Sequence, residues 1–351
     1  MTLHLFTPYH DEALAQGSPY YYPSSAARTL MARWWALPAL WAEAGDAVVL
    51  PDEAERADSP FLGEGVRVVR WSELRHLPIR QVQPWGWDAL TIRRLSEAGV
   101  DSRLLPDEAA MQRLRQLSSR RTSVQLLPRI RQAVGAETIG EARMCGSQEE
   151  VADCLTQWGN VVAKAPWSCS GRGVFRIAHP APQTAWARVR KILRQQGSIE
   201  IEPYYERAMD LALEYEVDNC GQVCFAGLSL FHTQEGGTYS GNLAGHPAVL
   251  QERIPPAVRP ALEAVRQALP SLLATHFSPY YRGPLGIDMM VVRMADQPDR
   301  LLLHPCVEIN LRPTMGYAAL WASRRLNDEG PYLFNPDAQT PQELFLKWEG
   351  A

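Results

Sequence analysis

Residues 301–317, with the sequence LLLHPCVEINLRPTMGY, decide how the rest of this chain is interpreted. An apolar strand runs into Glu308 and Asn310, and Arg312 and a turn follow. Because side chains alternate along a strand, these three polar residues are predicted to share one face. Carboxylate and amide oxygens suit Mg²⁺, and a guanidinium suits phosphate. A capped strand end with a surface ion pair would give the same pattern. The rest of the chain is therefore needed to distinguish such a strand end from a binding site.

The composition is that of an ordinary globular protein, since 46% of the 351 residues are hydrophobic and 21% are charged. The length predicts two or three domains. A formal net charge of −4 argues against a general nucleic-acid binder. The chain starts with no secretory leader and has no apolar run of about 18 residues, so we expect a cytoplasmic protein that does not span a membrane. Its six scattered cysteines form no zinc pattern and are expected to be reduced.

The first part of the chain predicts a small α/β domain with a parallel sheet, because strand and helix patterns alternate. The predicted elements are strands at 3–7, 47–50 and 66–69, a helix from Ser24 or Ser25 to Trp41, and a helix at 88–98. The turn after the first strand carries Asp11, at the end of the strand where ligands sit in open α/β sheets. Asp11 is therefore a candidate substrate residue. The alternative is a polar loop that caps a helix.

A buried strand at 161–165 contains one lysine, Lys164. Because lysine is rarely buried without a partner, this side chain either leaves the sheet at an edge or meets an anion. The next residues, PWSCSGRGVFRI, predict a donor-rich loop between two strands. Its candidate phosphate-binding residues are Ser168, Ser170, Gly171 and Gly173. The loop is neither a Walker loop nor a Rossmann fingerprint, since a strand and not a helix follows the glycines. An ordinary turn between two strands would have the same composition, so that alternative stays open.

Further along, Glu202 ends a strand that is expected to break at Pro203, and Asp210 follows the break. Unpaired backbone N–H and C=O groups at such a break can form hydrogen bonds with the edge of a planar base. The glycine-rich residues 232–245 predict a long polar loop, and loops of that length are often functional. Its candidate substrate contacts are Tyr239, Ser240 and Asn242. Asp288 is the only charged residue of an apolar strand at 283–292.

Taken in order, these segments resemble the ATP-grasp superfamily. The matching residues are Lys164, the loop 168–173, Glu202 to Tyr204, Asp210, Asp288 in G-x-x-G-x-D, and Glu308 to Pro313 in E-I-N-x-R-P. The resemblance implies an α/β protein that is α+β in its C-terminal half: an ATP-grasp fold of two α+β subdomains preceded by a small parallel-sheet α/β domain. The implied domains are 1–115, 116–200 with the phosphate loop, and 201–351 with the metal site.

The resemblance also implies ATP and Mg²⁺, with Mn²⁺ as an alternative metal, and a role for each matching residue. Lys164, the loop residues and Arg120 would contact the phosphates, although many members have lysine where this chain has Arg120. Glu202 and the backbone near Tyr204 would hold adenine, and Asp210 would hold the ribose. Asp288, Glu308 and Asn310 would coordinate the metal. Arg312 and Lys164 would be catalytic, Arg312 by stabilising the transferred phosphoryl group.

The activity implied by the resemblance is ATP-dependent ligation of a carboxylate to an amine through an acyl-phosphate. Its substrates would be small or peptide-like. Two alternatives stay open: a protein that binds or senses ATP without catalysis, and an ATP-grasp kinase that phosphorylates a hydroxyl group. We expect no nucleic-acid or membrane partner, and a homodimer is compatible with the sequence. No motif identifies the substrate.

Overall fold

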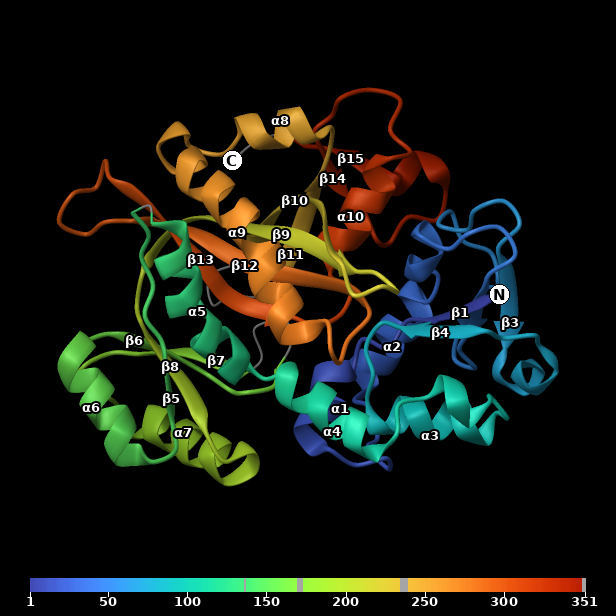
Figure 1. Ribbon diagram of the computed structural model, residues 1–351, viewed down its shortest axis with the longest axis horizontal. Coiled ribbons are helices and arrows are strands. Elements are labelled where there is room, and N and C mark those ends of the chain that lie inside the picture. The colour runs from blue at the N-terminus through green and yellow to red at the C-terminus, as the bar shows by residue number, and fades with distance from the viewer. Residues whose placement is uncertain (136, 169–172, 234–238, 349–351) are drawn as a thin grey trace. The chain divides into compact units, whose positions relative to one another are not determined.

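We describe the protein from a computed structural model (Figure 1). The structure describes all of the chain except residues 136, 169–172, 234–238 and 349–351. The chain forms two compact units, each assembled from separate stretches. Unit 1 contains Met1–Arg115, Asn242–Val249 and Arg312–Ala351, and unit 2 contains Gln116–Gly241 and Leu250–Leu311. The three-domain division drawn from the sequence stays a prediction.

Unit 1 contains a parallel sheet of four strands in the order β3-β2-β1-β4. The strands are β1 (Thr2–Leu5), β2 (Ala47–Leu50), β3 (Arg67–Arg70) and β4 (Gln81–Pro84). The predicted parallel α/β domain is confirmed. After β1 the chain adds β2 and β3 on one side and then returns to add β4 on the other. The direction of strand addition therefore reverses between β1 and β4.

Helices lie in two of the connections of this sheet and after its last strand. The connections contain α1 (His10–Gln16), α2 (Ser25–Trp34), η1 (Leu37–Leu40) and η2 (Trp71–His76), and β4 is followed by α3 (Ala89–Glu97), η3 (Ser102–Leu104) and the start of α4 (Glu108–Leu117). Ser24 caps α2 by accepting a hydrogen bond from the Ala27 N–H at 3.2 Å. The expectation of one helix up to Trp41 was wrong, because α2 ends at Trp34. Pro38 has no N–H to donate and disfavours a helical residue before it, so a 3₁₀ turn follows instead.

The C-terminal residues also belong to unit 1. They form α10 (Met315–Ser323), β14 (Tyr332–Phe334), η5 (Pro341–Leu344) and β15 (Phe345–Lys347), and β14 pairs with Leu243 and Ala244 at the end of β11 (Tyr239–Ala244). Ala318 and Ala319 of α10 and Phe334 of β14 are buried in one hydrophobic core with Trp35 and Leu37. The two ends of the chain therefore share a core.

Unit 2 contains an antiparallel sheet of four short strands in the order β5-β8-β6-β7. They are β5 (Arg143–Cys145), β8 (Ile199–Pro203), β6 (Val161–Lys164) and β7 (Val174–Ile177). The helices α6 (Gln148–Trp158) and α7 (Gln183–Gln196) share a core with one face of this sheet (Figure 1). Val161, Ala163, Ile199 and Ile201 point into that core. Alternation then puts Lys164, and the glutamates of β8, on the opposite face.

The second sheet of unit 2 is larger and antiparallel. It includes β13 (Leu301–Asn310), β12 (Gly283–Arg293), β9 (Glu206–Val217) and β10 (Val223–Thr233) in that order. The helices α5 (Arg120–Val134) and α9 (Arg259–Phe277) pack on it (Figure 1). The remaining elements are α8 (Pro247–Glu252) and η4 (Pro256–Val258). Ser119 caps α5 by accepting a hydrogen bond from the Arg121 N–H at 3.3 Å.

Two sequence expectations about these strands were wrong. Within the expected long polar loop at 232–245, the described residues are largely strand, because β10 continues to Thr233 and β11 occupies Tyr239–Ala244, whereas 234–238 lie outside the described residues. The interruption after Pro203 is also shorter than expected, since β9 already begins at Glu206. Glycine and polar residues suggested a loop at the first place, and Pro203 with the polar residues after it suggested a break at the second, whereas pairing with a neighbouring strand extends the ladder in both.

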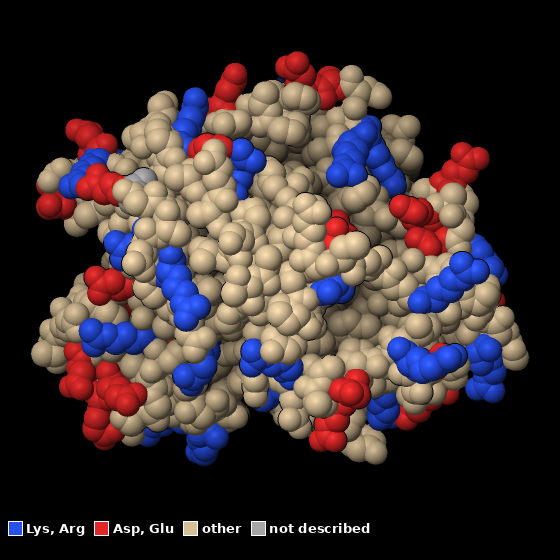
Figure 2. Space-filling view, in the orientation of Figure 1, with Lys and Arg blue, Asp and Glu red and all other residues tan. Residues whose placement is uncertain are grey.

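None of the described helices is both long and apolar enough to cross a membrane. Figure 2 shows acidic and basic side chains interspersed on the face that it displays. Acidic side chains gather over α6, where Glu149 and Glu150 occupy the first helical turn. Negative side chains at that end of a helix interact favourably with its dipole.

Candidate functional site

Lys164 is a buried cation of unit 2, with only 6% of its side chain exposed. Its Nζ lies 2.8 Å from Oε2 of Glu202 and 3.3 Å from Oε1 of Glu200. Burial lowers the pKa of Lys164, but the two carboxylates outweigh that effect and hold the pKa above its ordinary value. The lysine is therefore charged. Of the two outcomes predicted for a buried strand lysine, the structure has the meeting with anions.

Glu200 is the residue of this cluster that the sequence analysis missed. In the antiparallel register of β6 and β8 it lies directly opposite Lys164. Burial raises the pKa of Glu200 to about 7, although Lys164 acts to lower it. The alternation IEIE at 199–202 signalled that both glutamates share a face, and only the register shows what they meet.

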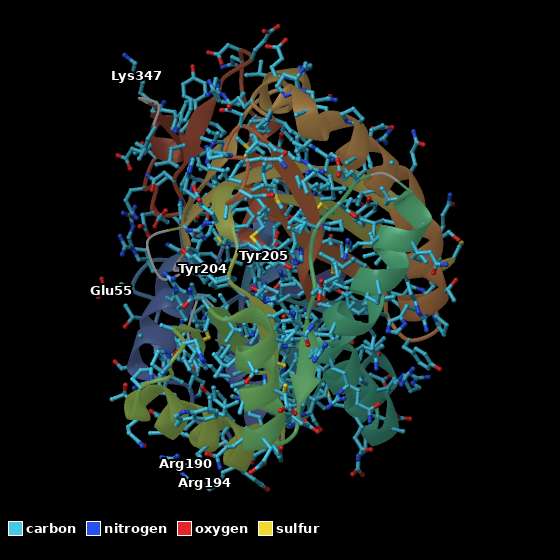
Figure 3. All side chains as sticks on the ribbon, turned by 90° about the vertical axis from the view of Figure 1, so that its left-hand side faces the viewer. Glu55, Arg190, Arg194, Tyr204, Tyr205 and Lys347 are labelled. Atoms are coloured by element: carbon cyan, nitrogen blue, oxygen red, sulfur yellow. The ribbon has the colours of Figure 1, made fainter. Side chains whose placement is uncertain are left out.

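Tyr204, labelled in Figure 3, lies where the chain passes from β8 to β9, and Glu202 lies near the end of β8. Glu202 is buried against Lys164, and Tyr204 is 45% exposed. The Tyr204 backbone N–H donates to the carbonyl oxygen of Asn160 at 2.9 Å. The guanidinium of Arg176 lies 3.9 Å from the centre of the Tyr204 ring. This segment therefore places a buried carboxylate close to an exposed aromatic ring and a guanidinium group. Such a surface can bind a planar ring by stacking and by hydrogen bonds.

Arg120 connects the strand β6 to the strand β13. One of its terminal nitrogens, Nη1, donates to the carbonyl oxygen of Ala165 at 2.7 Å and to Oγ of Ser168 at 2.5 Å. The other, Nη2, lies 2.7 Å from Oε1 of Glu308. The arginine is nearly buried, so its charge is not screened by solvent. It brings the predicted phosphate loop and the predicted metal site into one cluster.

The predicted phosphate loop is only partly described. Ser170 and Gly171 lie outside the described residues, whereas Ser168 and Gly173 lie within them. Gly173 has φ of +77°, and a Cβ there would come within 3.0 Å of the Ala165 Cβ. Its carbonyl oxygen accepts from the Ala165 N–H at 3.0 Å, which closes the base of the loop. Glycine is therefore required at this position by both conformation and space.

The predicted metal ligands Asp288, Glu308 and Asn310 lie together on neighbouring strands. Asp288 and Glu308 are direct partners in the register of β12 and β13, and Nδ2 of Asn310 donates to Oδ2 of Asp288 at 3.1 Å. All three are partly exposed. Two carboxylates and an amide oxygen form a donor set that fits a hard cation such as Mg²⁺. Glu308 is held by Arg120, so a cation bound there would meet a carboxylate that is already oriented.

Asp210 lies in β9, near the start of the longer sheet. Its Oδ2 accepts from the hydroxyl of Thr233 at 2.7 Å and lies 3.3 Å from Nη1 of Arg207. Burial raises the pKa of Asp210 above its ordinary value. The carboxylate is therefore oriented by two neighbours. Its predicted contact with a ribose stays a prediction.

Arg312 does not continue the face of Glu308 and Asn310, contrary to expectation. The strand ends at Asn310, and Arg312 belongs to unit 1. There its Nη2 and Nε donate to Oδ2 of Asp11 at 3.0 and 3.3 Å. The turn that follows the strand carries Pro313, which cannot extend the ladder. The structure thus brings together two residues that were predicted for separate roles.

The remaining substrate candidates occupy consecutive parts of β11. Tyr239 is partly buried, Ser240 is exposed and Asn242 is buried. Burial raises the pKa of Tyr239 well above its ordinary value. No described neighbour identifies a ligand for them, so their substrate role stays a prediction.

A scan against protein-family models and a search of curated proteins both find no match to this sequence. Solved structures do match. Biotin carboxylase from Campylobacter jejuni, solved as a β-γ-ATP complex, aligns over 91% of this chain and 67% of its own with 14% identity and a TM-score of 0.55. A pyruvate carboxylase from Rhizobium etli aligns over 99% of this chain and 30% of its own with 15% identity and a TM-score of 0.52.

This chain has the ATP-grasp fold. N5-carboxyaminoimidazole synthetase from Staphylococcus aureus, complexed with ADP, also aligns over 95% of this chain and 79% of its own, with 12% identity and a TM-score of 0.46. The biotin carboxylase and pyruvate carboxylase alignments, with TM-scores of 0.55 and 0.52, confirm the ATP-grasp fold predicted from the sequence. At these identities the similarity defines the fold and leaves the reaction to be argued from the residues.

Proposed function

We propose that this ATP-grasp protein is an ATP- and Mg²⁺-dependent ligase that joins a carboxylate to an amine. The observation that carries the proposal is the grouping of Asp288, Glu308 and Asn310 with two buried cations, Lys164 and Arg120, in one compact unit. Phosphoryl transfer needs such positioning and charge neutralisation more than it needs a dedicated base. Biotin carboxylase, which shares the fold, was solved with a β-γ-ATP ligand.

In this proposal the triphosphate of ATP contacts Lys164, Arg120 and the loop around Ser168. The adenine edge lies against the Glu202–Tyr204 segment, and the ribose against Asp210. Asp288, Glu308 and Asn310 hold Mg²⁺, which when bound neutralises phosphate charge. ATP must compete with the glutamates that now pair with Lys164. The lysine is therefore kept charged and oriented until a triphosphate arrives.

The chemistry then proceeds in two balanced steps. A carboxylate oxygen of the substrate attacks the γ-phosphorus of ATP, the bond to the β-phosphate oxygen breaks, and ADP leaves. An amine then attacks the acyl-phosphate carbon, phosphate leaves, and the nitrogen loses a proton. Arg312 is proposed to neutralise the acyl-phosphate. The products are an amide, ADP and free phosphate.

The test measures nucleotide binding and turnover separately. Calorimetry should show that Mg-ATP binds the wild-type protein, and that Glu308→Gln and Asp288→Asn weaken this binding at least about tenfold, since each loses a charge-assisted contact to the metal. Incubation with ATP, Mg²⁺ and pools of amino acids and carboxylates should release ADP and phosphate. Arg300→Gln, at an exposed ion pair with Glu137 in the same unit, is the control and should behave as wild type.

Other outcomes point to other functions. Tight Mg-ATP binding without turnover in any pool would favour a protein that binds or senses ATP. A stable phosphoester without free phosphate would favour a kinase. Absence of Mg-ATP binding would contradict the proposal as a whole.

The proposal includes a cytoplasmic location and small or peptide-like substrates, without nucleic-acid or membrane partners. Within the described part of the chain the cysteines Cys145, Cys154, Cys220, Cys224 and Cys306 are free thiols. Free thiols are usual in a reducing compartment. Mn²⁺ would fit the same oxygen donors as Mg²⁺. A homodimer stays a prediction.

A further inference from the structure

Two buried thiols of unit 2 lie in contact with each other. The Sγ atoms of Cys145 and Cys154 are 3.8 Å apart, and the two residues are 2% and 1% exposed. Cys145 is the last residue of β5 and Cys154 lies in α6, so the contact joins a strand to a helix that packs on its sheet (Figure 1). Cysteine also serves as a small apolar core residue, so further observations have to separate a reactive pair from ordinary packing.

The turn between the two cysteines is held by hydrogen bonds from the chain before and within α6. The Gly146 N–H donates to Oε2 of Glu150 at 2.5 Å, and the Glu150 N–H donates to Oγ of Ser147 at 3.2 Å. These contacts fix the start of α6 relative to the end of β5. Because the thiols are kept together in this way, each is present at a high effective concentration for the other.

The closed pair is protected from casual reaction. Both thiols face the apolar core beneath α6 and α7. Burial, and after it the neighbouring Cys154, raises the pKa of the Cys145 thiol above its ordinary value. Since the thiolate is the nucleophile, reaction has to begin in molecules in which this region has opened locally.

The strand β5 is well placed for such local opening. It lies at the edge of its sheet and pairs with β8 over three residues. A short edge strand has few interactions to lose when it separates from its neighbour. A covalent bond from Cys145 to α6 would hold the strand in place once it has closed again.

We propose that Cys145 and Cys154 form a reversible disulfide bond that ties β5 to α6, with a low-molecular-weight disulfide such as oxidised glutathione as the oxidant. One thiol loses its proton and attacks the oxidant, which releases one glutathione and leaves a mixed disulfide on the protein. The second thiol loses its proton, attacks the mixed disulfide and releases the second glutathione. Two protein thiols are thereby oxidised by two electrons, and the oxidant is reduced to two glutathione molecules, which take up the two protons.

The bond would bring the sulfur atoms from 3.8 Å to about 2.05 Å and close a loop of residues 145–154. Such a cross-link stabilises the folded protein because it restricts the unfolded chain. In a reducing compartment the pair stays reduced, and the bond forms when oxidised glutathione accumulates. This inference does not depend on the proposed ligase reaction, which uses neither cysteine.

The test uses the full-length double variant Cys220→Ser, Cys224→Ser, which removes two exposed thiols and leaves four of the six cysteines. The protein is incubated, and separately refolded from urea, at set ratios of reduced to oxidised glutathione. Two thiols should be lost on oxidation, and mass spectrometry of peptides should locate the bond between Cys145 and Cys154. The midpoint of thermal unfolding should rise by about 4 °C or more, and dithiothreitol should reverse both changes.

Cys145→Ala and Cys154→Ala, made in the same background, should each abolish the loss of two thiols and the rise in the midpoint. Cys306→Ala removes another buried thiol of unit 2 and should leave both effects intact. Each variant is compared with its own reduced form, so a general loss of stability does not affect the comparison. The proposal would be overturned by absence of the bond after both treatments, by a bond between other cysteines, or by a bond that leaves the midpoint unchanged.

Discussion

Arg312 donates two hydrogen bonds to the carboxylate of Asp11, although 301 positions separate the two residues. Arg312 lies just beyond the strand of Glu308 and Asn310, and Asp11 lies in the first helix of the chain. Such a pair, mostly shielded from solvent, is stronger than an exposed ion pair. The contact ties the turn after β13 to the carboxyl edge of the N-terminal sheet.

We predict that Arg312→Lys lowers ATP-dependent ADP release at least about tenfold, because lysine keeps the charge but cannot donate in a fork. The free energy of unfolding should fall by about 1 kcal/mol, from the lost hydrogen bond to Asp11. Steady-state kinetics and urea unfolding measure the two effects. Arg103→Lys changes an exposed pair with Asp101 and is the control. Unchanged turnover in Arg312→Lys would leave this arginine with a structural role only.

Replacement of Lys164 should affect both stability and nucleotide binding. Lys164→Met leaves Glu200 and Glu202 without their buried cation, which should cost about 3–5 kcal/mol of unfolding free energy. It should also weaken Mg-ATP binding at least about tenfold. The triple variant Lys164→Met, Glu200→Gln, Glu202→Gln removes the unpaired charges, so most of the stability should return while nucleotide binding stays weak. Wild-type affinity for Mg-ATP in the triple variant would contradict a phosphate-binding role for Lys164.

His304 should make the protein sensitive to acid. It is completely buried, and neither ring nitrogen has a partner among the described residues. Burial, reinforced by the charges of Lys164 and Arg131, lowers its pKa from 6.5 to about 3. The unfolded chain therefore binds a proton between these values that the folded chain does not, so stability should fall as the pH drops from about 6.5 towards 3.

His304→Leu should flatten this pH dependence and raise the unfolding free energy at pH 5 by about 1–3 kcal/mol, because it removes buried groups that lack partners. Unfolding in guanidinium chloride at a series of pH values measures both the unfolding free energy and its dependence on pH. His246→Leu makes the same change at an exposed position and should leave the slope with pH unchanged. A variant at His304 that keeps the full acid sensitivity would show that other groups cause it.

Gly173→Ala should lower the unfolding free energy by about 1–3 kcal/mol, since alanine is strained at its φ of +77° and its Cβ would crowd Ala165. Because this residue closes the base of the phosphate loop, Mg-ATP affinity should fall as well. Gly146→Ala is the matched control, with ordinary φ and no atom closer than 3.8 Å, and should change stability by less than about 0.5 kcal/mol. Equal effects in the two variants would remove the conformational explanation.

Local patterns predicted several elements well. Four apolar residues predicted β2, and Ser24 predicted the start of α2, where the serine accepts from the Ala27 N–H at 3.2 Å. For Lys164 the sequence left two outcomes open, leaving the sheet at an edge or meeting an anion, and the structure has the second. Such features depend on residues close together in the chain, which is the information that propensity and spacing contain.

Contacts between residues far apart in the chain could not be predicted from the sequence. Glu200 becomes informative only through the register of β6 and β8, and His10 meets Asp88 only because β1 and β4 are neighbours. The strand β4, QVQP, was missed because four residues ending in proline carry little pattern. Arg312 was expected beside Glu308, but the strand ended first. In each case tertiary pairing decides what a local pattern leaves open.

The position of Lys164 opposite Glu200 also restricts how the sheet of β6 and β8 can form. A shift of one residue between these strands would turn Lys164 towards the apolar core beneath α6 and α7, or turn both glutamates there. Each alternative pairing would leave a charge among leucine, isoleucine and valine side chains. The same lysine that is proposed to meet ATP therefore also selects the alignment of the strands while the chain folds.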